Sequence, residues 1–247
     1  MRTLRLAVIL GVGALVTVPS SVALGSPAVR AYEITITNLT SGQPLTPPVV
    51  ATHRGAYDAF DVGGDASVGV QQIAENGNGG PLLAELSASK HVSDSLETAT
   101  GPLVPAGTPG AATFDDSVTF SITAAPGSNR LSFVSMLICT NDGFTGADGV
   151  KLPNRTGKIV TRAFAAYDAG TEINTEDLAD MVPPCQALIG VADDGGAPGT
   201  GMTDPALSEG GVIHHHQGIM GGADLLPAVH GWDTTLPVSL ITIERTA

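Results

Sequence analysis

The chain has few aromatic residues and few cations. The first shortage limits the side chains that can fill a core, and the second excludes some classes of binding partner. Aromatic residues make up only 4% of the 247 residues, so aliphatic side chains must fill any core. The 11 Lys and Arg residues stand against 24 Asp and Glu, which gives a formal net charge of −13. Such a surface repels phosphate backbones and anionic headgroups, so we expect neither nucleic-acid binding nor insertion into a membrane.

The motifs of the common catalytic classes are also missing. The chain has no HExxH zinc helix, no GxSxG nucleophile elbow, and no glycine-rich phosphate loop followed by Lys and Ser or Thr. Two pairs of adjacent carboxylates, at 115–116 and 193–194, are better explained as solvated turns, since neighbouring residues rarely share one site. We therefore predict a protein that is not an enzyme.

The N-terminus has the pattern of a signal peptide over residues 1–25. Arg2 and Arg5 supply a positive start, and residues 6–18 form an uncharged apolar run. This run is too short for an ordinary membrane span, and small residues up to Gly25 follow it. An uncleaved anchor is the alternative. Cleavage predicts a secreted, extracellular or periplasmic protein.

Only two cysteines occur, Cys139 and Cys185. An even count in an exported chain predicts one disulfide between them. The closed loop would stabilise the fold by about 3–4 kcal/mol in the chain-entropy model. Two buried free thiols are the alternative, while a metal site lacks the CxxC spacing that it would need.

The pattern of the remaining chain predicts one domain over residues 32–247, folded as an all-β antiparallel sandwich with long loops and one or two short helices. Residues 32–37 alternate between apolar and polar side chains, as in a half-buried strand. The other expected strands lie at 118–123, 131–138, 159–167 and 238–243, and the expected helices lie at 68–75 and 81–86.

A turn, a strand and a long loop give further predictions about how the chain is arranged. Pro126 and Gly127 form a turn signal between the strands at 118–123 and 131–138, which predicts an antiparallel hairpin. The strand at 131–138 is apolar on both faces, which indicates a central position in a sheet. Residues 189–211 are dense in Gly, Asp and Pro and are expected to form a long loop.

Acidic residues follow two of the expected strands. Asp142 comes after the strand that ends near residue 138, and Asp168 and Glu172 come after the strand that ends near residue 167. If these strand ends meet, the three carboxylates converge, and carboxylate oxygens are the ligands that Ca²⁺ prefers. Gly170 allows the second loop to turn. Asp and Gly are also ordinary turn formers, so the spacing alone leaves the metal site open.

Three segments resemble spondin N-terminal domains of the F-spondin and mindin type. Residues 32–40, with the prolines that follow them, resemble the opening of this family in exported prokaryotic proteins. Residues 168–172, DAGTE, resemble its Asp-Ala-Gly-Thr-Asp motif, and residues 141–144, NDGF, resemble its Pro-Asp-Trp loop. The resemblance extends over about residues 32–245, and the motif at 168–172 is its most specific part.

The resemblance implies a sandwich of about eight antiparallel strands, similar to C2 domains, with one Ca²⁺ site. Carried over position by position, it makes Asp142, Asp168 and Glu172 the side-chain ligands. Two positions depart from the family pattern: Glu172 replaces Asp, and Phe144 lies one residue later than the expected Trp. The implied function is a Ca²⁺-binding adhesion or interaction module, whose partner would be an unidentified extracellular protein or glycan.

A run of three histidines supports an alternative function. In a strand, His214 and His216 would share a face, and His230 or His53 nearby would complete a Zn²⁺ or Cu²⁺ site. A metal-bound water would then make an extracellular metalloenzyme. A solvated loop, or a single buried histidine that bonds to the backbone, is the simpler explanation.

Overall fold

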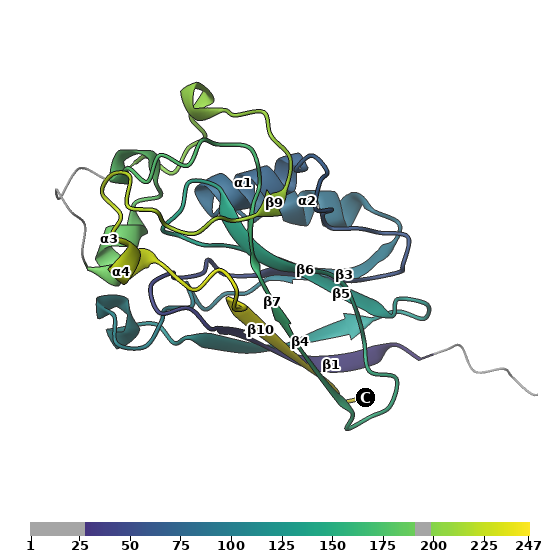
Figure 1. Ribbon diagram of the computed structural model, residues 1–247. Coiled ribbons are helices and arrows are strands. Elements are labelled where there is room, and N and C mark those ends of the chain that lie inside the picture. The colour runs from purple at the N-terminus through teal and green to yellow at the C-terminus, as the bar shows by residue number, and fades with distance from the viewer. Residues whose placement is uncertain (1–27, 191–198) are drawn as a thin grey trace, which may run out of the picture.

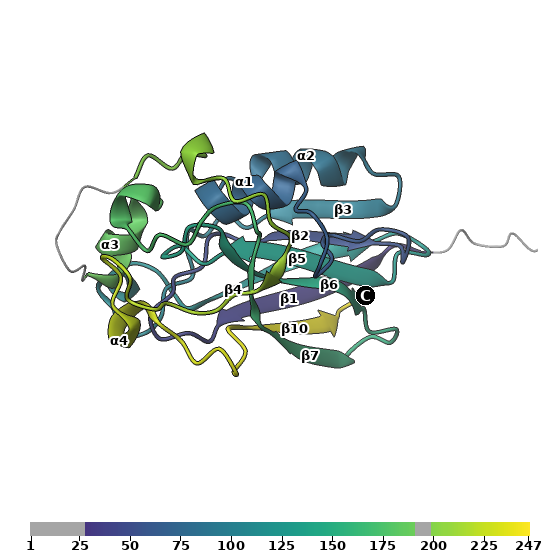
Figure 2. The ribbon, with the colours of Figure 1, turned by 45° about the horizontal axis from the view of Figure 1, so that its top comes forward.

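The computed structural model describes residues 28–190 and 199–247, which form two antiparallel sheets stacked face to face (Figures 1 and 2). The first sheet has the order β4 (Ser117–Ala124), β1 (Arg30–Asn38), β10 (Ser239–Arg245) and β7 (Ile159–Phe164). The second has the order β3 (Val92–Glu97), β2 (Val49–His53), β5 (Arg130–Met136), β6 (Gly143–Lys151), β8 (Ala166–Asp168) and β9 (His214–His215). The predicted all-β sandwich is confirmed.

The helices are short and lie on one side and at one end of the sandwich (Figure 1). They are α1 (Val68–Asn76), α2 (Gly80–Ala88), α3 (Pro184–Ile189) and α4 (Pro227–His230), with 3₁₀ turns η1 (Pro109–Ala112), η2 (Leu178–Asp180) and η3 (Pro205–Leu207). Among the described residues, no helix has the length and apolar character required to cross a membrane. The predicted signal peptide and the middle of the predicted loop at 189–211 lie outside the described residues.

Strand β1 forms because its side chains alternate. Tyr32, Ile34 and Ile36 are fully buried between the sheets, whereas Glu33 lies on the exposed side. β1 lies between β4 and the last strand, β10, and is antiparallel to both. The two ends of the described chain meet there, since the N–H of Ala31 donates to the carbonyl of the final residue at 3.2 Å.

Strand β5 is central, as its apolar character on both faces predicts. It pairs with β2 on one side and with β6 on the other. Leu131 and Phe133 face the core between the sheets, and Val134 packs with the side chains of α1 and α2. Both predicted helices therefore form because they cover the outer face of the second sheet, as Figure 2 shows.

The predicted hairpin between residues 118–123 and 131–138 is wrong. The turn itself forms, and the N–H of Ser128 donates to the carbonyl of Ala125 at 3.0 Å. However, β4 pairs with β1 in the first sheet, whereas β5 pairs with β2 and β6 in the second. The turn is a corner of the sandwich, where the chain crosses from one sheet to the other.

The predicted strand at 159–167 is two strands in different sheets. β7 pairs with β10 in the first sheet, and β8 pairs with β6 in the second, with a break at Ala165. The break carries the chain across the sandwich, so Asp168 arrives next to the start of β6. A sequence pattern does not distinguish this crossing from a continuous strand, because both segments remain extended.

Strand β6 has no recognisable strand pattern in the sequence because three of its residues are glycine. Gly143, Gly146 and Gly149 interrupt any apolar alternation in it. A Cβ at Gly146 would lie 2.5 Å from the carbonyl oxygen of Phe133, so the two strands approach each other only because this position is glycine. The NDGF segment that we expected as a loop therefore contains the first residues of a central strand.

The predicted disulfide is formed between Cys139 and Cys185, which are 46 residues apart. It ties the end of β5 to α3, and both cysteines are fully buried in a second apolar cluster with Met136, Leu178 and Leu225. This cluster fills the end of the molecule at which the long loops gather.

At the same end of the molecule, a buried carboxylate joins two loop segments by hydrogen bonds. Glu176 accepts hydrogen bonds from the backbone N–H groups of Met220, Gly221 and Gly222 at 2.5, 2.6 and 2.7 Å. Its own backbone has a φ of 59°, the only positive φ of a non-glycine residue in the described part of the chain. Charge-assisted bonds of this kind are strong, and they hold residues 220–222 against η2.

We predict that replacing both Cys139 and Cys185 with Ala lowers the free energy of unfolding by about 4 kcal/mol, because the unfolded chain regains the entropy of a long loop. Urea denaturation of the variant and the native protein measures the difference. Dithiothreitol should destabilise the native protein and leave the variant unchanged. Equal stability of the two proteins would contradict the prediction.

We also predict that Glu176→Gln costs about 2–3 kcal/mol, because an amide replaces one of the two oxygens that receive three backbone N–H groups. Glu209→Gln is the matched control, since Glu209 is an exposed carboxylate in a neighbouring loop, and it should change stability by less than about 0.5 kcal/mol. Thermal and urea unfolding compare the two. Similar midpoints for both variants would show that the Glu176 contacts contribute little.

Candidate metal-binding site

Asp142 is held by a tight turn between β5 and β6. The hydroxyl of Thr140 donates to the carbonyl of Leu137 at 2.6 Å and accepts from the N–H of Gly143 at 2.9 Å. A Cβ on Gly143 would lie 2.4 Å from that hydroxyl, so the turn requires glycine there. The turn places Asp142 immediately before β6, where its side chain is fully buried.

One oxygen of Asp142 fastens the DAGTE loop. Its Oδ2 accepts from the N–H of Thr171 at 2.7 Å, from the Thr171 hydroxyl at 3.1 Å and from the N–H of Glu172 at 3.0 Å. The backbone carbonyl of Asp142 also accepts from the N–H of Ala169 at 3.1 Å. Two stretches that lie about 30 residues apart in the sequence are therefore joined through one aspartate.

Asp168 lies beside Asp142 because β8 pairs with β6, and Asp168 stands opposite Gly143 in that register. Its carboxylate is buried and accepts from the N–H of Gly170 at 2.8 Å and from the side-chain amide of Asn174 at 2.6 Å. Gly170 has a φ of +70°, and a Cβ there would lie 2.5 Å from the backbone nitrogen of Val212. The loop can therefore turn only with glycine at this position.

The closeness of the two buried carboxyl groups disfavours the charged form of Asp142. Burial and, second, the neighbouring Asp168 raise the pKa of Asp142 to about 7, although its hydrogen bonds to Thr171 and Glu172 act in the opposite direction. The other oxygen, Asp142 Oδ1, is buried and has no hydrogen-bond partner among the described residues. A buried oxygen in that state is costly unless a cation or a proton meets it.

The carboxylate of Glu172 belongs to a different group. Its side chain accepts from the N–H of Asp204 at 3.4 Å and lines a small pocket of about 120 Å³ together with Glu75 and Asp180. Burial first, and then the charge of Glu75, raise the pKa of Glu172 to about 8. The backbone of Glu172 thus supports Asp142, while its carboxylate faces other acids.

The structure therefore brings together two of the three predicted ligands. Within the described ranges, no three His, Cys, Asp or Glu side chains are grouped as a metal site. Asp142 and Asp168 suit a hard cation, because they offer carboxylate oxygens and one of these has no other partner. The participation of Glu172 stays a prediction.

The side chains of the three consecutive histidines lie in different surroundings. His214 is half-exposed, and its Nδ1 lies 3.6 Å from Asp168 Oδ1. His215 stacks on the ring of Tyr167 with centroids 5.1 Å apart. Of the other histidines, buried His53 bonds to Ser132 in the second sheet, and buried His230 accepts from the N–H of Leu226 at 3.0 Å. The shared site that we considered for the metalloenzyme is not formed among the described residues.

His216 is buried next to the aspartates, which the sequence did not indicate. Its Nδ1 accepts from the N–H of Gly218 at 3.0 Å, its Nε2 has no partner in the described part of the chain, and its ring lies 5.2 Å from that of Trp232. Burial lowers its pKa to about 4, while the charge of Asp168 acts in the opposite direction. A neutral ring therefore packs under the carboxylate pair.

Two further residues at the site were missed in the sequence. Thr171 donates to Asp142, and Asn174 donates to Asp168. Thr171 lies inside the DAGTE motif, so its position gave a usable signal. Nothing in the sequence indicated Asn174, because its hydrogen bond to Asp168 depends on how the chain after Asp168 folds back.

Comparison with known families agrees with this geometry. The Spondin_N family model matches residues 42–178, which is more than half of the chain and includes Asp142, Asp168 and Glu172. No curated protein matches the sequence. Spondin domains are extracellular, and theirs is not a known enzyme family. The family match, the two-sheet fold and the position of the DAGTE loop lead to one conclusion: this chain belongs to the spondin N-terminal domain family.

Proposed function

We propose that the protein is an exported interaction module that binds Ca²⁺ between Asp142 and Asp168 and is not an enzyme. The observation that carries the proposal is the buried Oδ1 of Asp142, which has no hydrogen-bond partner among residues 28–190 and 199–247 and lies beside a second buried carboxylate. A cation at this point would satisfy the oxygen and offset the repulsion between the two charges. Glu172 would be the third side-chain ligand once its carboxylate turns out of the pocket that it shares with Glu75 and Asp180.

The donor chemistry favours Ca²⁺ over softer metals. Asp142 and Asp168 offer only carboxylate oxygens, and Ca²⁺ accepts six to eight oxygen ligands in flexible arrangements that include backbone carbonyls and water. When bound, the ion would supply positive charge and rigidity to the loops rather than a reactive centre.

The bound ion would act on the loops at one end of the sandwich. Asp142 holds the DAGTE loop, Gly170 contacts residues 211–212, and Glu172 forms a bridge with Ser208. Fixing these loops would present one defined surface to an extracellular protein or glycan. Export is supported by the disulfide, by the family and by the signal-peptide pattern at residues 1–25.

We predict that saturating Ca²⁺ raises the melting temperature of the protein, and that EDTA reverses the rise. At a free concentration of about 100 times Kd, the stabilisation is about 2.7 kcal/mol, or roughly 5–10 °C for a domain of this size. Asp142→Asn and Asp168→Asn should each abolish the rise, because a neutral amide binds Ca²⁺ weakly. Differential scanning calorimetry measures it.

The matched control is Asp116→Asn, which removes an exposed aspartate in front of β4, in the other sheet. This variant should retain the full Ca²⁺ response. Absence of any response in the native protein, or an equal response in the Asp142 and Asp116 variants, would remove the proposed site.

Metal analysis separates the proposed module from the metalloenzyme. We predict that untagged protein, purified without chelators and dialysed against Ca²⁺, contains about one Ca²⁺ per chain and only traces of Zn²⁺ or Cu²⁺. Stoichiometric Zn²⁺ or Cu²⁺ that is lost in a His214→Ala variant would instead favour the histidine-based enzyme.

A further inference from the structure

Strand β7 is an edge strand whose inner face is partly uncovered. Val160, Arg162 and Phe164 stand opposite residues of β10 that are buried in the core or close to it, so these three side chains occupy inward-facing positions. Arg162 is nevertheless exposed. A charged residue at an inward position of a sandwich needs an explanation.

The opening exists because β8 is short. β8 pairs with β6 only over residues 143–145, so in the described chain the second half of β6 has no strand on that side. An open groove of about 590 Å³ remains between β6 and β7. Its walls are formed by Val150, Leu152, Pro153, Val160 and Phe164, and Lys151, Asn154, Lys158 and Arg162 supply the polar groups.

The charged residues of the groove are all cations, in a protein with a net charge of −13. Within the described ranges, no carboxylate lies within 4 Å of the charged groups of Lys151, Lys158 or Arg162. Among the described residues, the guanidinium of Arg162 donates to one group, the backbone carbonyl of Thr161, at 2.7 Å. No described Lys or Arg pairs with a carboxylate, so what distinguishes these three cations is that they gather around one groove, where they would attract an anionic ligand.

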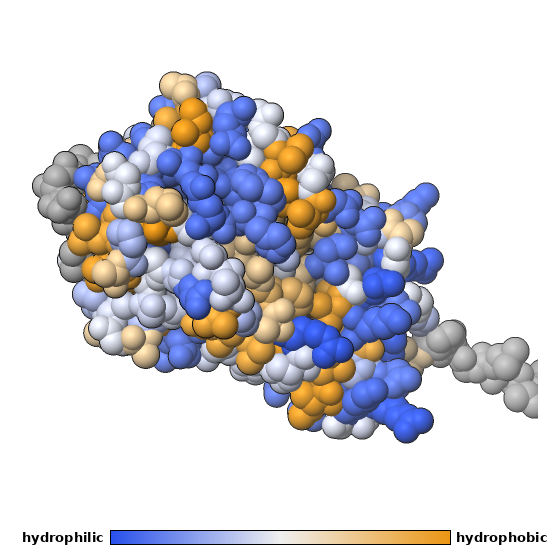
Figure 3. Space-filling model, viewed as in Figure 1, coloured by the Kyte–Doolittle hydropathy of each residue, from blue (hydrophilic) through white to orange (hydrophobic). Residues whose placement is uncertain are grey.

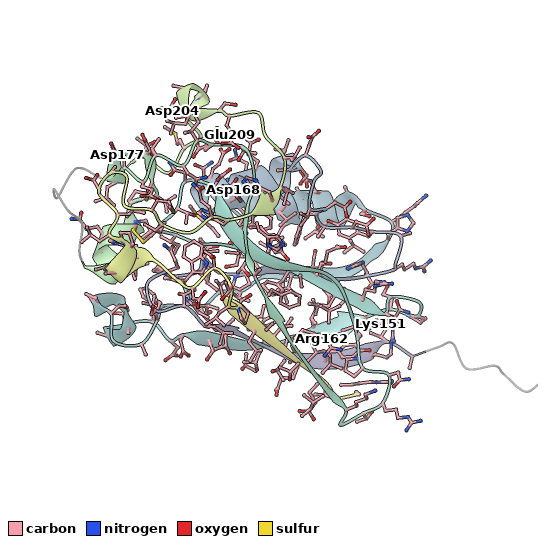
Figure 4. All side chains as sticks on the ribbon, viewed as in Figure 1. Lys151, Arg162, Asp168, Asp177, Asp204 and Glu209 are labelled. Carbon is pink, nitrogen blue, oxygen red and sulfur yellow. A yellow bond between two sulfur atoms is a disulfide. The ribbon has the colours of Figure 1, made fainter. Side chains whose placement is uncertain are left out.

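Lys151 and Arg162 lie away from the acidic residues at and near the proposed Ca²⁺ site. In Figure 4, Lys151 and Arg162 lie at the lower end of the molecule, while Asp168, Asp177, Asp204 and Glu209 lie at the upper end. Figure 3 shows strongly hydrophilic and apolar surface side by side at the lower end. A cationic group against apolar walls suits a ligand that has both an anionic and an apolar part.

Protection of an edge strand accounts for part of this arrangement. An inward-pointing charge, such as Arg162, discourages another strand from pairing with the edge. That role needs no groove with apolar walls, and it needs neither Lys151 nor Lys158, which lie outside β7. The three cations around one concave apolar surface therefore indicate recognition in addition to protection.

We propose that the groove between β6 and β7 binds a small organic anion with an apolar body, of the class of a medium-chain carboxylate. The carboxylate lies between Lys158 and Arg162, and the hydrocarbon lies on Val150, Val160 and Phe164. The volume is within the usual range for small-ligand sites. The groove shares no residue with the proposed Ca²⁺ site, so either proposal can fail without the other.

The test is isothermal titration calorimetry with decanoate, kept below its critical micelle concentration, in the presence of EDTA. The comparison ligands are decanol, which lacks the charge, and inorganic phosphate, which lacks the apolar body. Decanoate should bind, and both comparison ligands should bind at least about tenfold more weakly. Raising the NaCl concentration should weaken the binding of decanoate, because the charges are exposed to solvent.

The double variant Lys158→Gln, Arg162→Gln should bind decanoate about fivefold to tenfold more weakly. The control Lys90→Gln removes an exposed cation outside the groove and should bind like the native protein. No binding of decanoate, equal binding of decanol, or equal binding of phosphate would each overturn the proposal. If the double variant does not fold, the salt dependence and the ligand comparison in the native protein still decide it.

Discussion

The hydrogen bonds that Asp142 accepts from the DAGTE loop are the contact on which the loop end of the molecule depends. They join the turn before β6 to the residues after β8, and these residues in turn touch residues 208–212. The same contact buries a carboxyl group next to Asp168, where water cannot reach it. Structural integrity and the proposed ion binding therefore involve the same side chain.

The sequence predicted β1, β4, β5 and β10, both long helices and the disulfide, whereas β3, β6 and β9 had no predicted counterpart. The predicted features have local signals: alternation in β1, a proline near the start of α2, and an even cysteine count. The hairpin and the long strand at 159–167 were wrong because sheet membership depends on partners far away in the sequence. The side-chain direction of Glu172 also lacked a local signal, since its hydrogen-bond donor, the N–H of Asp204, lies 32 residues away.

The proposed Ca²⁺ site and the cationic groove lie in different parts of the sandwich. In Figure 4, Asp168 lies in the upper part, and Lys151 and Arg162 lie in the lower part. Both regions arise from the same interruption: the chain leaves the first sheet at Ala165, which ends β7, and the short strand β8 then delivers Asp168. One crossing between sheets therefore produces the acidic site and leaves the cationic groove uncovered.

The central place of β1 in the first sheet also affects when the protein can fold. β1 is the first described strand and β10 is the last, and they pair along nearly their whole length. A ribosome or a translocation pore that still holds the C-terminal residues leaves β1 and β7 without their shared neighbour. Contacts of such high sequence separation form slowly. The first sheet therefore closes only when residues 239–245 are free to pair with β1 and β7.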